Sequence, residues 1–413
     1  MPWPPHDSTL DRLRSGALAG ATTLDLRGAG LHTLPPEVLH LADTLEVLDL
    51  SGNALPELPA ELARCTRLHT LFASNNRFKR LPEVLGRLPR LDTLGFKANQ
   101  IAEVPAAALA PSLRWLILTD NRVAELPPTL TDCTRLEKLM LAGNRLQRWP
   151  AGLEQLQRLE LLRLSANAFQ RLEEALPDEL LQLPALTWLA HAGNPFGQAW
   201  ETAAAPGEAG TAAAVHWAEL QLQERLGEGA SGHIHAATWQ PADGGPARPV
   251  AVKLFKAAVT SDGWPASEMA ATLRAGTHPG QLGVCGPVQG HPEGRPALVL
   301  PRLPAGWRPL AGPPSMASCT RDVYDPALRL PPSQAAAIAA QVAAALDHLH
   351  ARGLTHGDLY AHNLLVDGQG GALISDFGAA SWCPPGDAAR ADRLRAIDRR
   401  AFAVLQAELA LLA

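Results

Sequence analysis

The sequence predicts an α/β solenoid followed by an α+β domain with two lobes, and three observations lead to this fold class. The first is a pattern of leucine and asparagine that recurs about every 23 residues through the N-terminal half. The second is a segment rich in Ala, Gly, Thr and Pro at 197–215, where the pattern ends. The third is a series of strand-like and helix-like runs after residue 218, interrupted by short polar motifs.

The overall composition is that of an ordinary globular protein with room for two or three domains. The 413 residues are 46% hydrophobic and 19% charged, with a formal net charge of −5. This charge favours neither nucleic acid nor an anionic membrane as a partner. The five cysteines are scattered without a C-x-x-C pair, the first residues lack the apolar core of a signal peptide, and no run approaches 18 apolar residues. We therefore expect a cytoplasmic protein.

Six segments of the N-terminal half fit the pattern L-x-x-L-x-L-x-x-N-x-L. Their asparagines are spaced 23, 23, 22, 23 and 23 residues apart, at Asn53, Asn76, Asn99, Asn121, Asn144 and Asn167. A weaker unit ends at Asn194, and a degenerate first unit has Ala29 in the asparagine position. The pattern predicts about eight units over 21–197, preceded by an N-terminal cap at 1–20.

The pattern resembles the leucine-rich repeat family, and simple physics explains it. The leucines point inward from a short parallel strand, and each Asn side chain is expected to bond backbone groups of the turn, forming a ladder from unit to unit. A proline six residues after the Asn position presets an extended return segment, at Pro35, Pro59, Pro82, Pro105, Pro127 and Pro150. Glu173 replaces this proline in the seventh unit, where we expect a local change of curvature.

The concave strand face carries an unusual number of large apolar residues. Two columns flank the buried leucine of each strand, and their larger apolar members are Phe72, Trp115, Ile117, Met140, Leu161 and Trp188. Exposed together they would form a patch that free surfaces rarely keep. One interpretation is a protein partner or substrate, and the other is contact with the second half of this chain.

A segment at 198–217 is predicted to be a linker, and three strand-like runs follow it. The run Gly227-Glu-Gly229-Ala-Ser-Gly232 fits G-x-G-x-x-G, and Lys253 stands in the third strand as Val250-Ala-Val-Lys253. A dinucleotide-binding fold would open a helix at the glycines, whereas here the flanks are strand-like. This context favours a hairpin whose backbone amides cover ATP phosphates, with Lys253 reaching the α- and β-phosphates.

Three further elements complete the predicted domain. Glu268 opens a helix-like run and is the candidate ion-pair partner of Lys253. The apolar run 297–304 fits a strand and hinge against which an adenine ring could lie. A long helix is predicted at 333–353, with one apolar face formed by Ile338, Val342, Leu346 and Leu349.

This helix leads to "THGDLYAHNLLVDGQGGALISDFGAA", residues 355–380. It contains H-x-D-L-x-x-x-N and D-F-G. Asn363 lies five residues after Asp358, and Asp376 lies eighteen residues after Asp358. Together with the glycine-rich run and V-A-V-K, these motifs resemble the protein kinase superfamily over 218–413. The resemblance implies a bilobal kinase-like domain with a shortened C-terminal lobe, acting as an ATP- and Mg²⁺-dependent protein kinase on Ser/Thr hydroxyls of proteins or on itself.

The resemblance also implies a role for each motif residue. Asp358 would orient the attacking hydroxyl and accept its proton, while Asn363 and Asp376 would hold Mg²⁺. His356 and Phe377 would be packing elements. Asp398 resembles a buried Asp that ties the catalytic loop to a core helix. The catalytic set is Asp358, Lys253 and Glu268, and the nucleotide-binding set is Leu226, Gly227, Gly229, Ser231, Gly232, Ile234, Ala251 and Lys253.

Several departures from the family leave two alternatives open. Gly357 stands in place of the Arg that pairs with a phosphorylated activation loop, and Tyr360 in place of a Lys that touches the γ-phosphate. Only 22 residues separate Asp376 from Asp398, and no A-P-E motif is present. One alternative is a small-molecule phosphotransferase of the aminoglycoside or choline kinase kind, which shares H-G-D. The other is a pseudokinase or scaffold whose repeats carry the function.

Overall fold

The computed structural model describes residues 6–203, 212–229, 231–256 and 259–413. It forms two compact units, one containing Met1–Leu162 and Asn167–Leu186, the other Arg163–Ala166 and Thr187–Ala413. The end of one repeat strand and the whole last repeat strand therefore belong to the second unit. Part of the predicted cap (1–5) and part of the predicted linker (204–211) lie outside the described residues. Helix α1 (His6–Arg14) lies within the cap segment.

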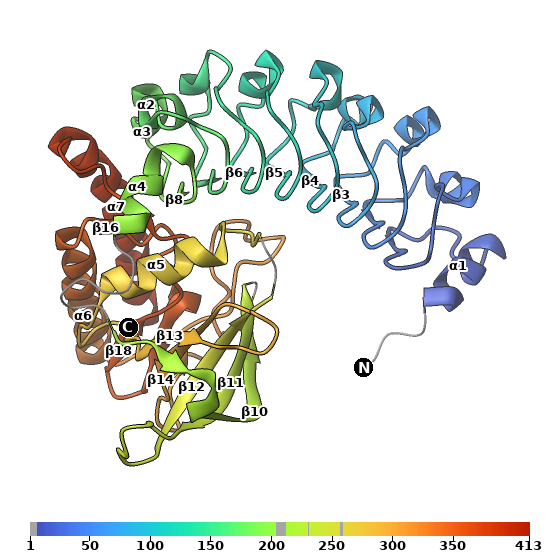
Figure 1. Cartoon of the computed structure of the whole chain (residues 1–413). Helices are drawn as coiled ribbons and strands as arrows, with labels where there is room; N and C mark the ends of the chain where they lie inside the picture. The colour runs from blue at the N-terminus through green and yellow to red at the C-terminus, as the bar shows by residue number, and fades with distance from the viewer. Residues whose placement is uncertain (1–5, 204–211, 230, 257–258) are drawn as a thin grey trace. The chain divides into compact units, whose positions relative to one another are not determined.

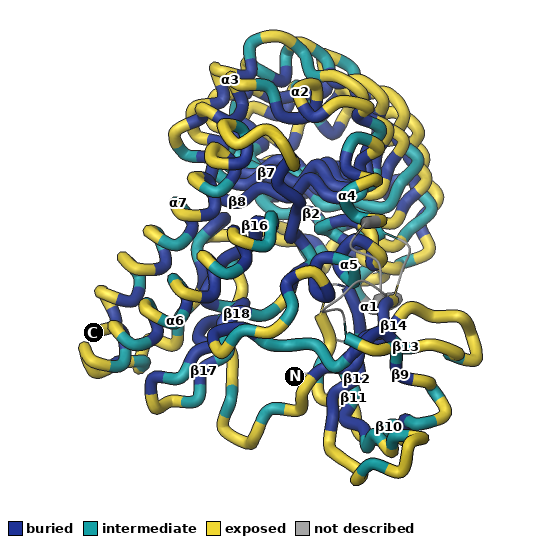
Figure 2. Tube along the Cα trace, turned by 60° about the vertical axis from the view of Figure 1, so that its left-hand side comes forward, coloured by how far each residue is buried: buried dark blue, intermediate teal, exposed yellow. Residues whose placement is uncertain are grey.

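The repeats form one sheet of eight short strands in sequence order, which Figure 1 shows as neighbours along the chain. The strands are β1 (Thr23–Asp25), β2 (Val47–Asp49), β3 (Thr70–Phe72), β4 (Thr93–Gly95), β5 (Trp115–Ile117), β6 (Lys138–Met140), β7 (Leu161–Arg163) and β8 (Trp188–Ala190). The pairing from β1 to β6 is parallel and keeps the central leucines in register, for example Leu48 with Leu71 and Leu71 with Leu94. These leucines are fully buried, which confirms the inward direction predicted from the pattern. Figure 2 shows the strands as a buried band and the outer turns as exposed.

Short helical turns return the chain from strand to strand on the outer side of the solenoid (Figure 1). They are η1 (Pro36–Leu41), η2 (Ala60–Arg64), η3 (Glu83–Arg87), η4 (Ala106–Ala108), η5 (Pro128–Asp132) and η6 (Leu153–Gln155). The prolines that precede the first five turns are extended, with φ between −58° and −70°, as the sequence predicts. After Glu173 replaces proline, two α-helices take over, α2 (Leu172–Ala175) and α3 (Asp178–Leu181).

The asparagine ladder predicted from the repeats is present. Asn121 is typical: its Oδ1 accepts from the Ile101 amide at 2.9 Å, and its Nδ2 donates to the Phe96 and Leu118 carbonyls at 2.8 and 3.0 Å. The same pattern recurs at the other ladder positions, Asn53, Asn76, Asn99, Asn144 and Asn167. Each side chain therefore links the backbones of neighbouring units.

The predicted apolar patch is only partly exposed. Phe72, Trp115, Ile117 and Met140 are half-buried, and the Lys138 ammonium lies 4.2 Å from the Trp115 ring. The prediction of exposure is wrong for Leu161 and Trp188, which are 4% and 1% exposed. Trp188 belongs to the second unit, where the Tyr360 ring covers it.

The second unit contains a smaller lobe built on a six-stranded sheet in the order β10-β11-β12-β14-β13-β9. Its strands are β9 (Val215–His216), β10 (Leu220–Glu228), β11 (Gly232–Trp239), β12 (Arg248–Phe255), β13 (Gly286–Gln289) and β14 (Ala297–Pro301). Turn η8 (Trp217–Glu219) precedes β10. Helix α5 (Pro265–Ala275) follows β12 and carries Glu268 on its buried side.

The larger lobe consists of two long helices and short strand pairs. The helices are α6 (Pro332–Ala351) and α7 (Ala388–Leu412), and the predicted apolar face of α6 is buried. The strands are β15 (Arg308–Pro309), β16 (Leu354–Thr355), β17 (Leu364–Val366), β18 (Ala372–Ile374) and β19 (Ser381–Trp382), with turn η9 (Ala361–Asn363) between β16 and β17. Turn η7 (Pro195–Gly197) and helix α4 (Gln198–Ala203) follow β8. Within the described part of the chain, no helix combines the length and apolar character needed to cross a bilayer.

Candidate active site

Lys253 and Glu268 form a buried ion pair between strand β12 and helix α5. The Lys253 ammonium contacts Glu268 Oε1, and the two side chains are 10% and 4% exposed. Burial lowers the pKa of Lys253, but the negative charges of Asp376 and Glu268 raise it by more, so the pKa of Lys253 is raised overall. Burial raises the pKa of Glu268 to about 7, against the opposing effect of Lys253. Lys253 is therefore a fixed cation at this place.

Asp376 lies beside this pair at a strained point of the chain. Its Oδ1 is 3.8 Å from the Lys253 ammonium and accepts from the Gly378 amide at 3.1 Å. Its backbone has a positive φ of 58°, a left-handed conformation that non-glycine residues rarely adopt. The Lys253 charge lowers the pKa of Asp376, which keeps this carboxylate ionised. An ionised carboxylate beside the Lys253–Glu268 pair is suited to hold a divalent cation.

Asp358 and Asn363 face each other across the loop between β16 and β17. Asn363 Nδ2 donates to the Asp358 carbonyl at 2.9 Å and to its Oδ2 at 2.8 Å. Because both donors of the amide are committed, the oxygen is the ligand atom that Asn363 can offer. Ser375, next to Asp376, bonds the Asn363 carbonyl through both its amide and its hydroxyl. This contact ties the loop to the D-F-G segment.

Asp398 of helix α7 anchors the same loop from beneath. Its Oδ2 accepts from the His356 amide at 2.8 Å, and its Oδ1 from the Gly357 amide at 3.0 Å. The His350 ring lies 3.1 Å from Oδ2. The anchoring that the sequence predicts for Asp398 is thus present. His356 is fully buried, with its ring 5.5 Å from that of Phe377, as packing elements would be.

The glycine-rich turn joins β10 and β11 as an antiparallel hairpin. Gly227 pairs with Ile234 in register, and the Gly229 amide donates to the Gly232 carbonyl at 2.9 Å. A Cβ on Gly232 would lie 2.6 Å from the Leu254 carbonyl, so only glycine allows this close approach. Open space surrounds the Cβ directions of Gly227 and Gly229. The backbone of this turn can approach a phosphate closely.

The other predicted nucleotide-binding residues lie on both sides of this hairpin. Leu226 is 48% exposed, whereas Ala251 is buried among the apolar residues of the sheet and Ile234 packs against them. Ser231 is buried, and its hydroxyl bonds Glu268, so it supports the ion pair from the glycine-rich turn.

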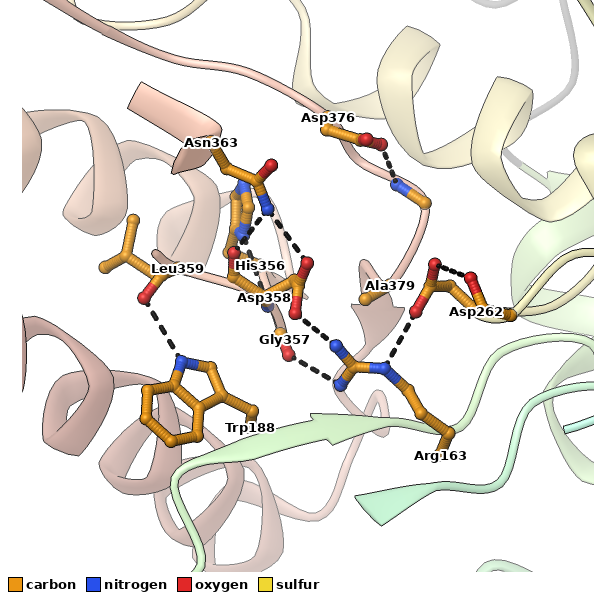
Figure 3. A network of polar contacts seen from close by, with 12 residues as sticks. Arg163, Trp188, Asp262, His356, Gly357, Asp358, Leu359, Asn363, Asp376 and Ala379 are labelled. Carbon is orange, nitrogen blue, oxygen red and sulfur yellow. Dashed lines mark hydrogen bonds and ion pairs between the residues drawn. The ribbon is translucent and has the colours of Figure 1, made fainter. Parts of the chain in front are cut away.

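Arg163, at the end of β7, is the main residue that the sequence did not identify (Figure 3). Its Nη2 contacts Asp358 Oδ1, its Nη1 donates to the Gly357 carbonyl at 3.1 Å, and its Nε donates to Asp262 Oδ1 at 2.8 Å. The side chain is only 3% exposed. The sequence indicates Arg163 only weakly: it is a cation at the position after the buried leucine of its repeat strand, where several other strands have apolar residues. Asp262, in the turn before α5, belongs to no motif, so the sequence does not indicate it.

Trp188, at the start of β8, covers the catalytic loop from the same side. Its ring stacks on Tyr360 with centroids 4.2 Å apart and planes 8° apart, and its Nε1 donates to the Leu359 carbonyl at 3.2 Å. Burial raises the pKa of Tyr360 well above its usual value, so its phenol stays neutral. Tyr360 is therefore a packing surface rather than a source of charge.

Gly357 has a steric reason to be glycine. Its φ is 72°, and a Cβ there would lie 2.5 Å from the Leu189 carbonyl and 2.6 Å from the Ala379 carbonyl. The backbone of β8 therefore takes up the space next to the loop that any side chain at this position would need. This packing explains why glycine, and not the arginine of the family pattern, stands at position 357.

The charges of the site fit a nucleotide with divalent cations. Four carboxylates (Asp262, Glu268, Asp358 and Asp376) surround two cations, Lys253 and Arg163. A Cβ on Gly378 would contact Asp376, Glu268 and Asp262 at 3.2–3.7 Å, which shows how closely these groups gather. No cluster of three or more His, Cys, Asp or Glu arranged as metal ligands occurs among the described residues. Mg²⁺ takes one or two carboxylates and completes its shell with phosphates and water, so Asp376 and the side-chain oxygen of Asn363 would suit it.

Comparisons with known proteins agree with this arrangement. Residues 220–396 match the family described as protein tyrosine and serine/threonine kinase, and residues 44–65 and 111–169 match leucine-rich repeat families. The DNA damage-responsive serine/threonine-protein kinase RqkA of Deinococcus radiodurans is 34% identical over 164 residues, 38% of this chain and 22% of that protein. An internalin (inlF) from Listeria monocytogenes matches with 23% identity and a TM-score of 0.36, covering 43% of this chain and 50% of that one, a likeness too weak to add to the assignment.

Two shorter matches are also to kinases. CBL-interacting protein kinase 4 of Oryza sativa subsp. japonica is 45% identical over 56 residues, 14% of this chain and 12% of that protein. The serine/threonine-protein kinase PknD of Mycobacterium tuberculosis is 49% identical over 51 residues, 12% of this chain and 8% of that protein. The chain thus spans less than a quarter of the length of each of these three kinases. It combines an N-terminal leucine-rich repeat region with a domain of the protein tyrosine and serine/threonine kinase family.

Proposed function

We propose that this protein is an ATP- and Mg²⁺-dependent protein kinase that phosphorylates Ser or Thr hydroxyls of proteins, including its own. The observation that carries the proposal is the joint presence of the Lys253–Glu268 ion pair and the group formed by Asp358, Asn363 and Asp376. Two of the relatives are named serine/threonine kinases, which supports the acceptor class.

Each residue then has a defined task. Lys253 binds the α- and β-phosphates and is held in place by Glu268, while the hairpin at Gly227, Gly229 and Gly232 covers the phosphates with backbone amides. Leu226, Ile234 and Ala251 enclose the base. Asn363 and Asp376 would hold Mg²⁺, which would neutralise the charge that develops on the transferred phosphoryl group.

Asp358 orients the acceptor hydroxyl and takes its proton. The reaction forms a bond from the acceptor oxygen to the γ-phosphorus, breaks the bond from that phosphorus to the β,γ-bridging oxygen, and releases ADP. The repeats supply a protein-binding surface, with half-buried Phe72, Trp115, Ile117 and Met140 as the contact residues for a partner or substrate.

The direct test is transfer of labelled phosphate from Mg-ATP, to the protein itself and to a generic basic protein. Wild type should transfer label, and Asp358→Asn should lower the rate at least about 100-fold, because the general base and its orientation are lost. Asp367→Asn, at an aspartate of the neighbouring β17–β18 turn, is the matched control and should keep the wild-type rate.

Three outcomes would contradict the proposal in different ways. Label transfer by Asp358→Asn at the wild-type rate would remove Asp358 from the reaction. An ATP-dependent rise in melting temperature without transfer by wild type would indicate a pseudokinase. Transfer only after a metabolite with a free hydroxyl is added would indicate a small-molecule kinase.

A further inference from the structure

We propose that Arg163 is a positioning residue for Asp358, supplied by the repeat strand β7 in place of the basic residues that the catalytic loop lacks at Gly357 and Tyr360. The inference rests on the proposed kinase function and deepens it. It assigns to a leucine-rich repeat residue a part in the reaction that the kinase motifs themselves do not contain.

The first argument is the number and kind of contacts. The guanidinium of Arg163 uses three of its nitrogens on three oxygens: Asp358 Oδ1, the Gly357 carbonyl and Asp262 Oδ1. With Asn363 on Oδ2, both oxygens of the Asp358 carboxylate are held. A planar fork with fixed donors restricts both the position and the rotation of this carboxylate.

The second argument is charge. Asp358 and Asp262 both lie against Arg163, and Asp376 is close to the same cluster. Without Arg163, two carboxylates at 19% and 22% exposure would face each other with no cation between them. Burial and Asp358 already raise the pKa of Asp262 against the effect of Arg163, so loss of Arg163 would raise that pKa further or push the two side chains apart. Either change would alter how Asp358 is placed to receive the acceptor hydroxyl. Tyr360 offers no charge to replace it.

The third argument is that Arg163 joins the two lobes. Asp262 lies in the turn of 260–263 that leads into helix α5, whose Glu268 pairs with Lys253. This turn packs close to the end of β7, because a Cβ on Gly263 would lie 2.7 Å from Ser165 Cβ. Arg163 therefore connects the segment that positions the Lys253 partner with the loop that carries Asp358. Loop phosphorylation commonly makes such a connection, but Gly357 leaves no arginine to receive a phosphate.

The same contacts could instead block the acceptor site, and the two interpretations make opposite predictions. An inhibitory Arg163 would release activity when removed. The intact Lys253–Glu268 pair beside Arg163 favours the positioning role, because the nucleotide side of the site is assembled while Arg163 is in place.

The test measures kcat and KM for ATP in the full-length protein. Arg163→Met keeps the length of the side chain and removes its charge, and Arg163→Lys keeps the charge but cannot make all three contacts. Arg163→Met should lower kcat about 100-fold, as expected when a catalytic group is misplaced by about 1 Å. KM for ATP should change less than about threefold, and Arg163→Lys should recover part of kcat.

Two further variants separate positioning from folding. Asp262→Asn should also lower kcat, and the double variant Arg163→Met with Asp262→Asn should lose little more than Arg163→Met alone, because both act through one bridge. Arg114→Met is the matched control: Arg114 is an ion-paired repeat arginine that contacts Glu137 at 2.9 Å, and its loss should leave kcat unchanged. An ATP-dependent thermal shift in each variant shows that the domain is folded. If Arg163→Met does not fold, Arg163→Lys and Asp262→Asn decide the question.

Wild-type kcat in Arg163→Met, or a higher one, would overturn the positioning role while leaving the kinase function intact, and a higher one would indicate inhibition. Additive losses in the double variant would also overturn it. Absence of transfer by the wild type would overturn the proposed function, and this inference with it.

Discussion

The asparagine ladder of the repeats and the Asp398 anchor of the kinase domain both provide hydrogen-bond partners for backbone groups, but they do so in different ways. Asn121 and Asp398 are both buried side chains that satisfy backbone groups of other segments. Two partners of Asn121, the Ile101 amide and the Phe96 carbonyl, lie 20 and 25 residues away in the sequence, and the arrangement recurs at the other ladder positions. Those of Asp398 lie 41 and 42 residues away and occur once. Asn121 is neutral, whereas Asp398 is charged.

This difference decides how the effect of one side chain is distributed over the molecule. A neutral amide shared among equal units gives each repeat a similar share of the stability. A single charged anchor concentrates the effect of one side chain on the loop that carries Asp358, and makes that effect depend on protonation. Variants of the two residues therefore test whether the comparison is real.

The largest effect on stability is expected at the charged anchor. Asp398→Asn replaces one acceptor oxygen with an NH₂ group that faces a backbone N–H donor, and we expect a loss of about 3 kcal/mol in the free energy of unfolding. Urea unfolding followed by circular dichroism measures it. Asp392→Asn, an exposed aspartate of the same helix paired with Arg395, is the control and should change little. Equal stability of the two variants would refute the anchoring role.

The loss at Asp398 should also depend on pH. Burial alone would raise the pKa of Asp398, but the bonds from His350 and from the His356 amide outweigh it, so the pKa is lowered. The unfolded chain, with a pKa of about 3.9, then binds more protons than the folded one below about pH 4. The contribution of Asp398 is complete above that pH and is lost as pH falls through its lowered folded-state pKa. The gap in unfolding free energy between wild type and Asp398→Asn should narrow there and stay constant between about pH 5 and 7.

A smaller loss without pH dependence is expected in the ladder. Asn121→Ala leaves the Ile101 amide and the Phe96 and Leu118 carbonyls without their side-chain partner, and should cost about 2 kcal/mol. Urea titrations at about pH 4 and pH 7 should give the same difference, since an amide does not titrate. A pH-dependent difference would mean that the ladder is not the cause.

The smallest effect should come from an exposed ion pair of the repeats. Arg148 pairs with Glu125, and the two side chains are 72% and 66% exposed. Arg148→Ala should change the free energy of unfolding by less than about 1 kcal/mol, and less still in high salt. A larger loss would show that surface pairs between units, rather than buried amides, hold the solenoid.

The repeat fold could be predicted in detail because its information is local and is repeated. The leucines, asparagines and prolines recur at one spacing, so each unit confirms the others, and the buried leucines and the extended Pro59 and Pro82 agree with the pattern. The helices α2 and α3 were not predicted. They replace the outer turn where proline is lost, and nothing in the repeat pattern specifies which element forms after such a loss.

The kinase motifs could be found from the sequence, but not the residues that meet them from elsewhere. The Lys253–Glu268 pair and the Asp398 anchor follow from motif resemblance, and both contacts are present. Arg163 lies 195 residues before Asp358, and the spacing of neither residue indicates the other. Trp188 was expected to be exposed because the repeat pattern places it on the concave face, and its stacking on Tyr360 depends on the fold of the second half.

The close approach of the Leu189 carbonyl to Gly357 bears on how such a chain can change its number of repeats. Units of a solenoid touch only their neighbours, so copies can be gained or lost near the N-terminal end without disturbing the catalytic loop. Between Arg163 and Leu189 the count is fixed, because a unit added or removed there would separate the arginine from the strand that closes over Gly357. Variation in repeat number among descendants of this gene should therefore be found upstream of Arg163.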